Sequence, residues 1–512
     1  MRNVLLLPAV LLFTVASAQP GTLDISFGTG GETLHSLGTP YDLIWDMAIQ
    51  PDDKIVVAGS VGAIGGGAFQ DAFVTRFTAD GAVDNTFGTN GTVVWTGTGG
   101  NDRIRGVDID VDGKVVVAGE TQVNGGETQM FIIRLLPDGT FDNTFSGDGL
   151  LTRPGSIYND GSYARDVKCM PDGSILVGGY EHYNLTTPNY NAVSFWKCTT
   201  TGAAPGNFGG VATGYTFADL FQDDQADVLN GMAVRADGSI VVGTQSYDGS
   251  YQRMGYATFN ADGSHLGNNA EVTYDFTVGN EFAYSIVLLP DERCVLAGGV
   301  TNQAGLMGVL PTGGPDASFG TAGKVNVQLG SSSTTLYAAL LQPWDKVLIT
   351  GALSGGGTNA AYLARYNSDG SPDAVFGAGG VATYQPGGSG GDGRAIGLQS
   401  DGRIIVAGNY SNGGNFDLFL VRFNNDLATG LPTVAPAPAL RAYPSPFTQA
   451  LTVVGTAARG TLTLFDAMGR AVRTAPTTEG RTEVNADVPA GVYTLQVRQR
   501  TGAVAALRVV KE

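Results

Sequence analysis

Charged residues, cysteine and histidine are all scarce in this chain. Only 15% of its 512 residues are charged, and it has three cysteines and three histidines. So few cysteines exclude a disulfide-bonded scaffold. Charged helix formers are rare, while Gly, Val, Thr, Tyr and Phe are common. The composition therefore favours an all-β protein with many tight turns over a helical one.

A short motif returns seven times along the chain. Each copy combines an acidic turn, an apolar run of β-forming residues and a terminal glycine. Successive copies start 60, 60, 65, 54, 53 and 57 residues apart, and a period of this size indicates a repeat architecture. The copies are PDDKIVVAG from Pro51, VDGKVVVAG from Val111, PDGSILVGG from Pro171, ADGSIVVG from Ala236, PDERCVLAG from Pro290, PWDKVLITG from Pro343 and SDGRIIVAG from Ser400.

A second motif alternates with the first. It reads FVTRFTADGAVDNTFGTNG from Phe73 and FIIRLLPDGTFDNTFSGDG from Phe131. Between the motifs, β-runs alternate with Asp-Gly turns and Gly-rich loops, which predicts four short antiparallel strands per period. Four strands repeated radially are the pattern of a β-propeller.

The phase of the repeat predicts how the ring closes. The last copy ends in LFLVRFNNDLATG (418–430) without a Phe-Gly motif, and the N-terminal segment LDISFGTGG (23–31) supplies one. An N-terminal strand around Glu32 to Ser36 is therefore expected to pair with the last repeat and remove the exposed edges. The prediction is a seven-bladed β-propeller of four-stranded blades over residues 19–427, closed by an N-terminal strand.

At these two motifs the chain resembles the delta-60 repeat family of bacterial β-propeller-like repeats. The resemblance covers about Thr22 to Leu427. It implies a fold rather than an activity.

The C-terminal part differs in composition from the repeats. Residues 428–440 are rich in Pro and Ala, as in a stiff linker. Residues 441–512 contain three β-runs and a Gly-Val-Tyr hairpin, which predict a small β-sandwich. They resemble a type IX secretion system type A sorting domain, with Ser445 where that family usually has Asn, and the resemblance implies the type IX export machinery as a partner. The residues that carry it include Tyr443, Pro444, Pro446, Phe447, Gly469, Gly491 and Tyr493.

The N-terminus predicts export. Residues 1–18 combine Arg2, an apolar run over residues 4–15 and the small residues 16–18, which is the pattern of a secretory signal peptide. No other stretch approaches a membrane-spanning length, so no transmembrane segment is expected after cleavage. Together with the sorting resemblance, this predicts a protein that is secreted or held on the outer surface of a Gram-negative bacterium.

Charge separates the two modules. Residues 441–512 carry a net charge of +4 from nine basic and five acidic residues, which leaves −23 on residues 19–440. Binding to nucleic acid relies on Lys and Arg to neutralise phosphates, so nucleic acid is not an expected partner.

Groups that recur in most repeats are expected to build the scaffold. Catalysis needs a unique constellation, whereas a repeat distributes one group around the ring. No catalytic or metal-ligand motif appears, no cofactor is expected, and the calcium-loop pattern of residues 108–113 lacks its Glu because position 119 is Gly119. The recurrent groups are Asp24, Asp84, Asp142, Asp316 and Asp373 of the Phe-Gly motif and Arg76, Arg134, Arg365 and Arg422 of the preceding strand.

Tyrosines gather where the copies differ. Rigid aromatic side chains on variable loops over a regular scaffold are typical of recognition surfaces. The hypothesis is a binding module for an extracellular glycan or protein, which uses Tyr-rich loops on one face. A secreted polysaccharide hydrolase or lyase and a passive structural protein of the envelope stay open as alternatives. The predicted ligand-binding residues are Tyr158, Tyr163, Tyr180, Tyr183, Tyr190, Tyr247 and Tyr251.

Overall fold

The chain divides into two compact units, Met1–Asp426 and Leu427–Glu512, in a computed structural model. The predicted signal peptide, residues 1–18, lies outside the described residues. The structure describes residues 19–425 and 441–511 except for 63–68, 98, 124–125, 154–158, 184–189, 210–213, 221–225, 267–270, 277–278, 302, 330–332, 356–357, 444–446, 455–460, 467–469, 478–480, 486 and 499–503.

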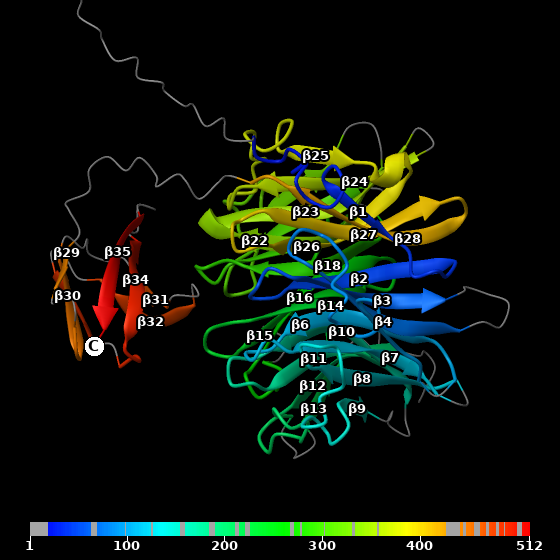
Figure 1. The fold of residues 1–512 in the computed structure, drawn as a ribbon, viewed down its shortest axis with the longest axis horizontal. Coiled ribbons are helices and arrows are strands. Elements are labelled where there is room, and N and C mark those ends of the chain that lie inside the picture. Colours follow the sequence, from blue (N-terminus) through cyan, green and yellow to red (C-terminus); the bar gives the residue numbers. More distant parts are fainter. Residues whose placement is uncertain are drawn as a thin grey trace, which may run out of the picture. The chain divides into compact units, whose positions relative to one another are not determined.

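Strands of the first unit pair antiparallel in successive groups of four, which confirms the predicted all-β class (Figure 1). The first three groups are β2 (Tyr41–Ile49), β3 (Ile55–Gly62), β4 (Gln70–Phe77) and β5 (Thr92–Trp95); β6 (Asp102–Ile109), β7 (Val115–Gln122), β8 (Thr128–Leu135) and β9 (Leu150–Arg153); and β10 (Asn159–Cys169), β11 (Ile175–Tyr183), β12 (Tyr190–Cys198) and β13 (Tyr215–Ala218).

The later groups repeat the same order. Two short 3₁₀ segments, η2 (Pro343–Asp345) and η3 (Pro386–Gly388), lie between strands. The groups are β14 (Val228–Val234), β15 (Ile240–Tyr247), β16 (Gln252–Phe259) and β17 (Glu271–Tyr274); β18 (Glu281–Leu288), β19 (Cys294–Val300), β20 (Gln303–Val309) and β21 (Lys324–Val327); β22 (Ser333–Gln342), β23 (Lys346–Gly355), β24 (Thr358–Tyr366) and β25 (Val381–Tyr384); and β26 (Gly391–Leu398), β27 (Ile404–Asn412), β28 (Asn415–Phe423) and β1 (Glu32–His35).

The N-terminal strand completes the last group. β1 runs antiparallel to β28, with Glu32 opposite Val421 and His35 opposite Leu418. This is the pairing that the phase of the repeat predicts. The first strands of successive groups also contact one another in the order β2, β6, β10, β14, β18, β22 and β26, and β26 contacts β2. The seven first strands therefore form a closed series.

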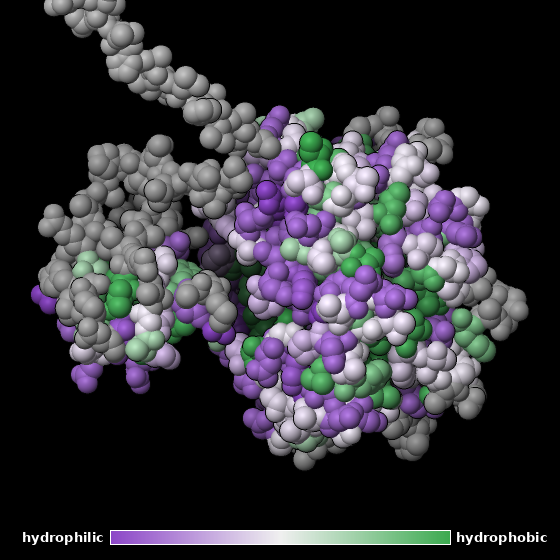
Figure 2. All heavy atoms as spheres, in the orientation of Figure 1, coloured by the Kyte–Doolittle hydropathy of each residue, from purple (hydrophilic) through white to green (hydrophobic). Residues whose placement is uncertain are grey.

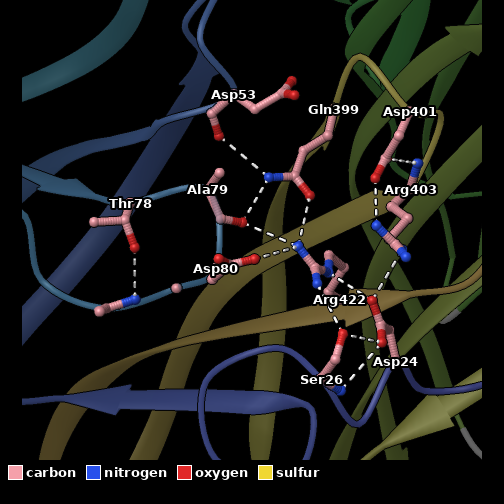
Figure 3. Close-up of polar contacts among 12 residues, drawn as sticks. Asp24, Ser26, Asp53, Thr78, Ala79, Asp80, Gln399, Asp401, Arg403 and Arg422 are labelled. Carbon is pink, nitrogen blue, oxygen red and sulfur yellow. Dashed lines mark hydrogen bonds and ion pairs between the residues drawn. The ribbon is translucent and has the colours of Figure 1, made fainter.

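A cluster of polar contacts reinforces this closure (Figure 3). Arg422 on β28 pairs through Nε with Asp24 Oδ2 at 2.8 Å and donates through Nη2 to Ser26 Oγ at 3.1 Å. Its Nη1 donates to the main-chain oxygen of Ala79, in the first group, at 3.0 Å. The guanidinium group thus joins the N-terminal segment, the last group and the first group.

The terminal glycine of the repeated motif has a steric cause. A Cβ on Gly59 of β3 would collide with the carbonyl oxygen of Leu43 on β2, and the same collision arises between Gly119 and Arg103. In both groups the first strand carries a β-bulge just after this contact. Glycine therefore recurs because the bulged strand comes close to its neighbour.

The hydrophobic core of the first unit lies between neighbouring groups. One cluster joins Val56 and Phe87 of the first group to Val117 and Phe131 of the second, all of them fully buried. Strand β3 is buried along nearly its whole length because a sheet covers each of its faces. This explains the continuous apolar run of the motif.

Two sheets build the C-terminal unit. Their buried residues, which include Phe447, Leu464, Val484 and Tyr493, form one hydrophobic cluster. One sheet has the order β29 (Arg441–Tyr443), β30 (Ala450–Val454) and β33 (Arg481–Asn485), and the other has the order β32 (Ala471–Pro476), β31 (Thr461–Phe465), β34 (Gly491–Arg498) and β35 (Val504–Lys511).

Candidate functional site

The recurrent Arg and Asp side chains form buried ion pairs. Arg76 Nε lies 2.8 Å from Asp84 Oδ2, and Arg134 Nε lies 2.8 Å from Asp142 Oδ2. Each guanidinium also lies over the phenylalanine of the same motif, at 4.6 Å from the ring of Phe87 and 4.9 Å from the ring of Phe145. The same pair recurs in two further groups as Arg365–Asp373 and Arg422–Asp24.

Hydrogen bonds hold these aspartates in the ionised form. Burial opposes ionisation of Asp84, but the hydroxyl and backbone N–H of Thr86 donate to its Oδ1 at 2.6 and 3.1 Å. These bonds and the charge of Arg76 lower the pKa of Asp84 to about 2. A group that closes the turn in several repeats is a scaffold element, as the sequence predicts.

In the fifth group, an arginine from a different position pairs with the recurrent aspartate. Gly308 occupies the backbone position of the strand arginine, because Asp316 N–H donates to its carbonyl oxygen as Asp84 N–H does to Arg76. Arg293, from the turn before β19, pairs with Asp316 instead at 2.6 Å. Asp316 therefore keeps a cationic partner, although this partner comes from the turn before β19 and not from strand β20.

A second set of positions shares its place in the fold but not its residue type. Each lies six residues before a repeated motif, on the first strand of its group, at the β-bulge. All seven side chains are half-buried. We call these the inner-ring positions: Trp45, Arg105, Arg165, Asn230, Tyr284, Tyr337 and Arg394.

Two of these arginines share one buried carboxylate. Arg105 Nη2 lies 2.7 Å from Glu120 Oε1, and Arg165 Nη1 lies 3.3 Å from Glu120 Oε2. Arg103, two residues before the bulge, lies 3.9 Å from the same carboxylate. Burial opposes ionisation of Glu120, but Arg105 and Arg165 lower its pKa below the usual range. Three guanidinium groups thus face one carboxylate.

Aromatic rings continue this series across the neighbouring first strands. The guanidinium of Arg105 lies 4.2 Å from the ring centroid of Trp45, and that of Arg394 lies 5.5 Å from it. Arg394 also lies 3.9 Å from the ring of Tyr337, whose ring is 6.4 Å from that of Tyr284. Alternating cations and π-faces attract each other. The inner-ring positions of β6, β2, β26, β22 and β18 therefore form one continuous arc.

Carboxylates next to the inner ring hold neighbouring first strands together. Asp46 Oδ2 accepts the backbone N–H of Val107 at 2.9 Å, and Asp166 Oδ2 accepts that of Met232 at 2.9 Å. Burial and the charge of Asp166 raise the pKa of Asp46 to about 7. These groups brace the inner strands, and Asp46 titrates near neutral pH.

The predicted tyrosines fall into three places. Tyr163 on β10 and Tyr180 on β11 stack with ring centroids 4.7 Å apart, and Arg165 Nη2 donates to the Tyr180 hydroxyl at 3.1 Å. Both therefore adjoin the inner ring. Tyr247 and Tyr251 flank the β15–β16 turn, where Arg253 lies 5.3 Å from the ring of Tyr251. Tyr158 and the side chains of Tyr183 and Tyr190 lie outside the described residues.

The predicted sorting residues are partly described. Phe447 is fully buried and Tyr493 is 5% exposed, and the hydroxyl of Tyr493 donates to the carbonyl oxygen of Pro489 at 2.7 Å. Gly491 begins β34, and Tyr443 ends β29. Pro444, Pro446 and Gly469 lie outside the described residues.

Sequence reasoning missed the inner ring. It sought variation in loop length and tyrosine content, whereas these residues vary at a fixed distance from a repeated motif. Aligning the seven copies at the motif and reading the sixth residue upstream would have found Trp45, Arg105 and Arg394.

The cysteines and the possible metal ligands of the described residues lie apart from the inner ring in these respects: the thiols are unpaired, and no metal-ligand cluster is found. Cys169 on β10 and Cys198 on β12 are unpaired, with β11 between them. Within the described ranges, no three or more His, Cys, Asp and Glu side chains are grouped so that they could bind a metal ion. The described segments also contain no helix with the length and apolar character needed to cross a membrane.

A family model matches four stretches of the first unit. It is described as a domain of unknown function (DUF5122) beta-propeller, and it matches residues 50–87, 112–145, 342–376 and 399–428. Each stretch contains one of the four strand arginines of the recurrent pairs. No curated protein matches the sequence of this chain. Together with the four-stranded sheets, the match supports a β-propeller family, which is the architecture of a binding or structural module.

Solved structures are similar to this chain at low identity. PorZ, an essential bacterial surface component of the type-IX secretion system of Porphyromonas gingivalis, is 12% identical with a TM-score of 0.38; the alignment covers 93% of this chain and 59% of PorZ. A protein of unknown function from Dyadobacter fermentans is 8% identical with a TM-score of 0.40, over 77% of this chain and 98% of that one. Sqt1 from Chaetomium thermophilum is 12% identical with a TM-score of 0.40, over 77% and 99%.

Proposed function

We propose that the first unit is a seven-bladed β-propeller that binds an extracellular glycan or protein at the inner ring. The closed series of seven first strands and the pairing of β1 with β28 support the blade number. The stacked Tyr163 and Tyr180 lie beside Arg165 and are proposed to extend the binding surface from it.

One observation carries the binding role. The scaffold pairs, the glycine and the motif recur from group to group, yet the inner-ring position holds Trp, Arg, Asn or Tyr. A position that served only to pack the ring would be filled by similar residues, as Arg fills the strand position in four of the seven groups and Asp the turn position in five, whereas the inner-ring position is divided among three Arg, two Tyr, one Trp and one Asn. The inner-ring side chains are half-buried, differ in type and contact one another across blades. Such a set is suited to bind an asymmetric ligand.

The second unit is proposed to be a sorting domain for the type IX export machinery, built as a β-sandwich. One shared hydrophobic cluster under two sheets supports the sandwich. With a signal peptide over residues 1–18, the protein would be exported and then secreted or retained on the cell surface. Mass spectrometry of the exported protein tests this: a new N-terminus at Gln19 supports it, and a cytoplasmic chain that keeps residues 1–18 contradicts it.

An array experiment tests the binding role. The exported protein is applied to immobilised saccharides and extracellular proteins, beside a variant that combines Tyr163→Ala with Tyr180→Ala. The control is Val375→Ser, because Val375 is 62% exposed in a Phe-Gly turn. We expect the double variant to lose binding to the retained ligand while the control keeps it. A ligand held equally by all three proteins would contradict binding at this surface.

A secreted polysaccharide hydrolase or lyase is the second candidate. Asp46, with a pKa raised to about 7, is the carboxyl group near the inner ring that is best suited to donate a proton. Release of oligosaccharides from a bound polysaccharide, lost in Asp46→Asn, would favour this candidate over binding alone.

A further inference from the structure

We propose that the inner ring binds the carboxylate of an acidic saccharide, a uronate-class sugar, through Arg105, Arg165 and Arg394. This rests on the proposed binding function and names the chemical class of its ligand. Three features of the inner ring and of the side chains beside it support this inference: an excess of cations, guanidinium groups fixed on aromatic rings, and a buried acceptor without a donor.

The excess of cations lies between β6 and β10. Arg103, Arg105 and Arg165 face the single carboxylate of Glu120, which leaves two positive charges without a carboxylate partner there. Burial lowers the pKa of Arg103; the charge of Glu120 opposes this shift, and the charges of Arg105 and Arg165 add to it. An added anion would relieve this repulsion. This local excess of positive charge contrasts with the net charge of −23 on residues 19–440.

The guanidinium groups are held in place before a ligand arrives. Arg105 and Arg394 lie over the ring of Trp45, and Arg394 also lies over Tyr337. Arg105 donates to Glu120 through Nε and Nη2, and Arg394 donates to Asp392 through the same two atoms. In both residues Nη1 has no acceptor among the described residues. A planar group fixed in this way loses little freedom on pairing with a carboxylate.

A buried acceptor distinguishes a sugar acid from a simple anion. Asp392 Oδ2 accepts hydrogen bonds from Arg394, whereas Asp392 Oδ1 is buried and receives no donor from the described residues. A buried acceptor without a donor is costly. The hydroxyl group of a sugar would supply the donor, while the sugar carboxylate would meet the neighbouring arginines. Acetate offers the anion without a hydroxyl group beside it.

The experiment compares sugars that differ in charge alone. Trisaccharides of galacturonate, glucuronate and mannuronate are titrated into the mature protein by calorimetry, each beside its methyl ester. The variants are Arg105→Gln on β6 and Arg394→Gln on β26, and the control is Arg473→Gln, an exposed arginine of the second unit. The melting temperature of each variant shows that it is folded.

We expect at least one acid trisaccharide to bind. Its methyl ester should bind at least about tenfold more weakly, since the loss of one charge-assisted pair has this magnitude. Both inner-ring variants should lose about tenfold in affinity for the acid, and the control should lose none. Asp392→Asn removes the acceptor for the sugar hydroxyl and frees Arg394 from its carboxylate, so it should reduce the preference of the protein for the trisaccharide over acetate.

Two results would overturn the acidic-saccharide inference. Equal affinity for acid and ester would remove the role of charge, and acid binding that Arg105→Gln and Arg394→Gln both leave intact would place the site elsewhere. If a neutral saccharide or a protein binds in an inner-ring-dependent way while no uronate does, the inference fails but the proposed function stands. If no ligand on the array depends either on Tyr163 and Tyr180 or, with the calorimetry variants applied to the same array, on Arg105 and Arg394, both fail.

Discussion

Arg134 and Arg105 make similar contacts in two regions of the same propeller unit. Each pairs with a buried carboxylate, at 2.8 Å to Asp142 and 2.7 Å to Glu120, and each lies over an aromatic ring. Arg occupies the position of Arg134 in four of the seven groups, each time paired with the same motif Asp, whereas it occupies the position of Arg105 in three groups and the other four hold Trp, Tyr or Asn. The contact alone does not separate scaffold from binding site. The difference lies in recurrence and in the number of cations per carboxylate.

The two regions also differ in how their acids ionise. Hydrogen bonds from Thr86 and the charge of Arg76 lower the pKa of Asp84 despite its burial, whereas burial and Asp166 raise the pKa of Asp46. The scaffold pairs are therefore stable as charges at neutral pH. Asp46, next to the inner ring, gains a charge at a free-energy cost as the pH passes neutrality.

The largest effect is expected from breaking a scaffold pair. Asp142→Ala leaves the buried guanidinium of Arg134 without its carboxylate, and such changes cost about 3 to 5 kcal/mol. Urea unfolding measures the loss. Asp112→Ala removes an exposed aspartate of a neighbouring turn and should cost less than about 0.5 kcal/mol. Equal losses would remove the distinction between recurrent and ordinary carboxylates.

The substitute arginine of the fifth group should matter more than its counterparts. Arg293→Ser removes the cation that pairs with Asp316, whereas Lys54→Ser leaves Asp84 paired with Arg76. We expect a loss of about 2 kcal/mol for Arg293→Ser and less than about 1 kcal/mol for Lys54→Ser. Thermal unfolding of both variants checks this order, and a larger loss for Lys54→Ser would contradict it.

The two acids should give opposite pH dependences. Asp84 has a pKa near 2 in the folded protein, against 3.8 for an unperturbed aspartate as in the unfolded chain. Its contribution to the free energy of unfolding is therefore complete above about pH 4 and falls as the pH drops toward 2. Asp46 has a pKa near 7 when folded, so its contribution is complete below about pH 4 and is lost as the pH rises through 7.

Asparagine variants separate these contributions. At pH 8 we expect Asp84→Asn to destabilise the protein and Asp46→Asn to stabilise it, each by about 1 kcal/mol or more. Unfolding midpoints measured from pH 3 to pH 9 would show the Asp46→Asn curve rising above the unmodified protein between pH 5 and pH 8. A parallel pair of curves would contradict the raised pKa of Asp46.

Only a small effect on stability is expected from a substitution within the inner ring. Arg394 pairs with Asp392 at a half-buried site, so Arg394→Gln should change the free energy of unfolding by about 1 kcal/mol or less. Calorimetric melting checks this. A loss as large as that of Asp142→Ala would show that the inner ring holds the fold together.

The sequence predicted the scaffold well because its causes are local and repeated. The missing Phe-Gly motif after β28 indicated the pairing with β1, and the recurrence of Arg76 and Asp84 indicated a structural pair. Hydrophilic side chains spread over the visible face of the first unit, with smaller hydrophobic patches among them (Figure 2).

The inner ring was harder to predict because it depends on bulges and on contacts between groups. Simple alternation along β2 would place Trp45 and Asp46 on opposite faces, but the bulge changes this register and leaves both half-buried. Arg105 and Trp45 lie sixty residues apart in sequence. Tyr163 and Tyr180 were expected in loops, whereas β10 and β11 extend far enough to include both.

One matched pair of substitutions tests the central claim, that recurrent residues hold the fold and the variable inner ring binds the ligand. Arg134→Gln and Arg105→Gln make the same chemical change at the two places. We predict that Arg134→Gln lowers the unfolding midpoint and keeps uronate affinity where the protein is folded, while Arg105→Gln keeps the midpoint within a few degrees and loses about tenfold in affinity. Loss of stability without loss of affinity in Arg105→Gln would contradict the account.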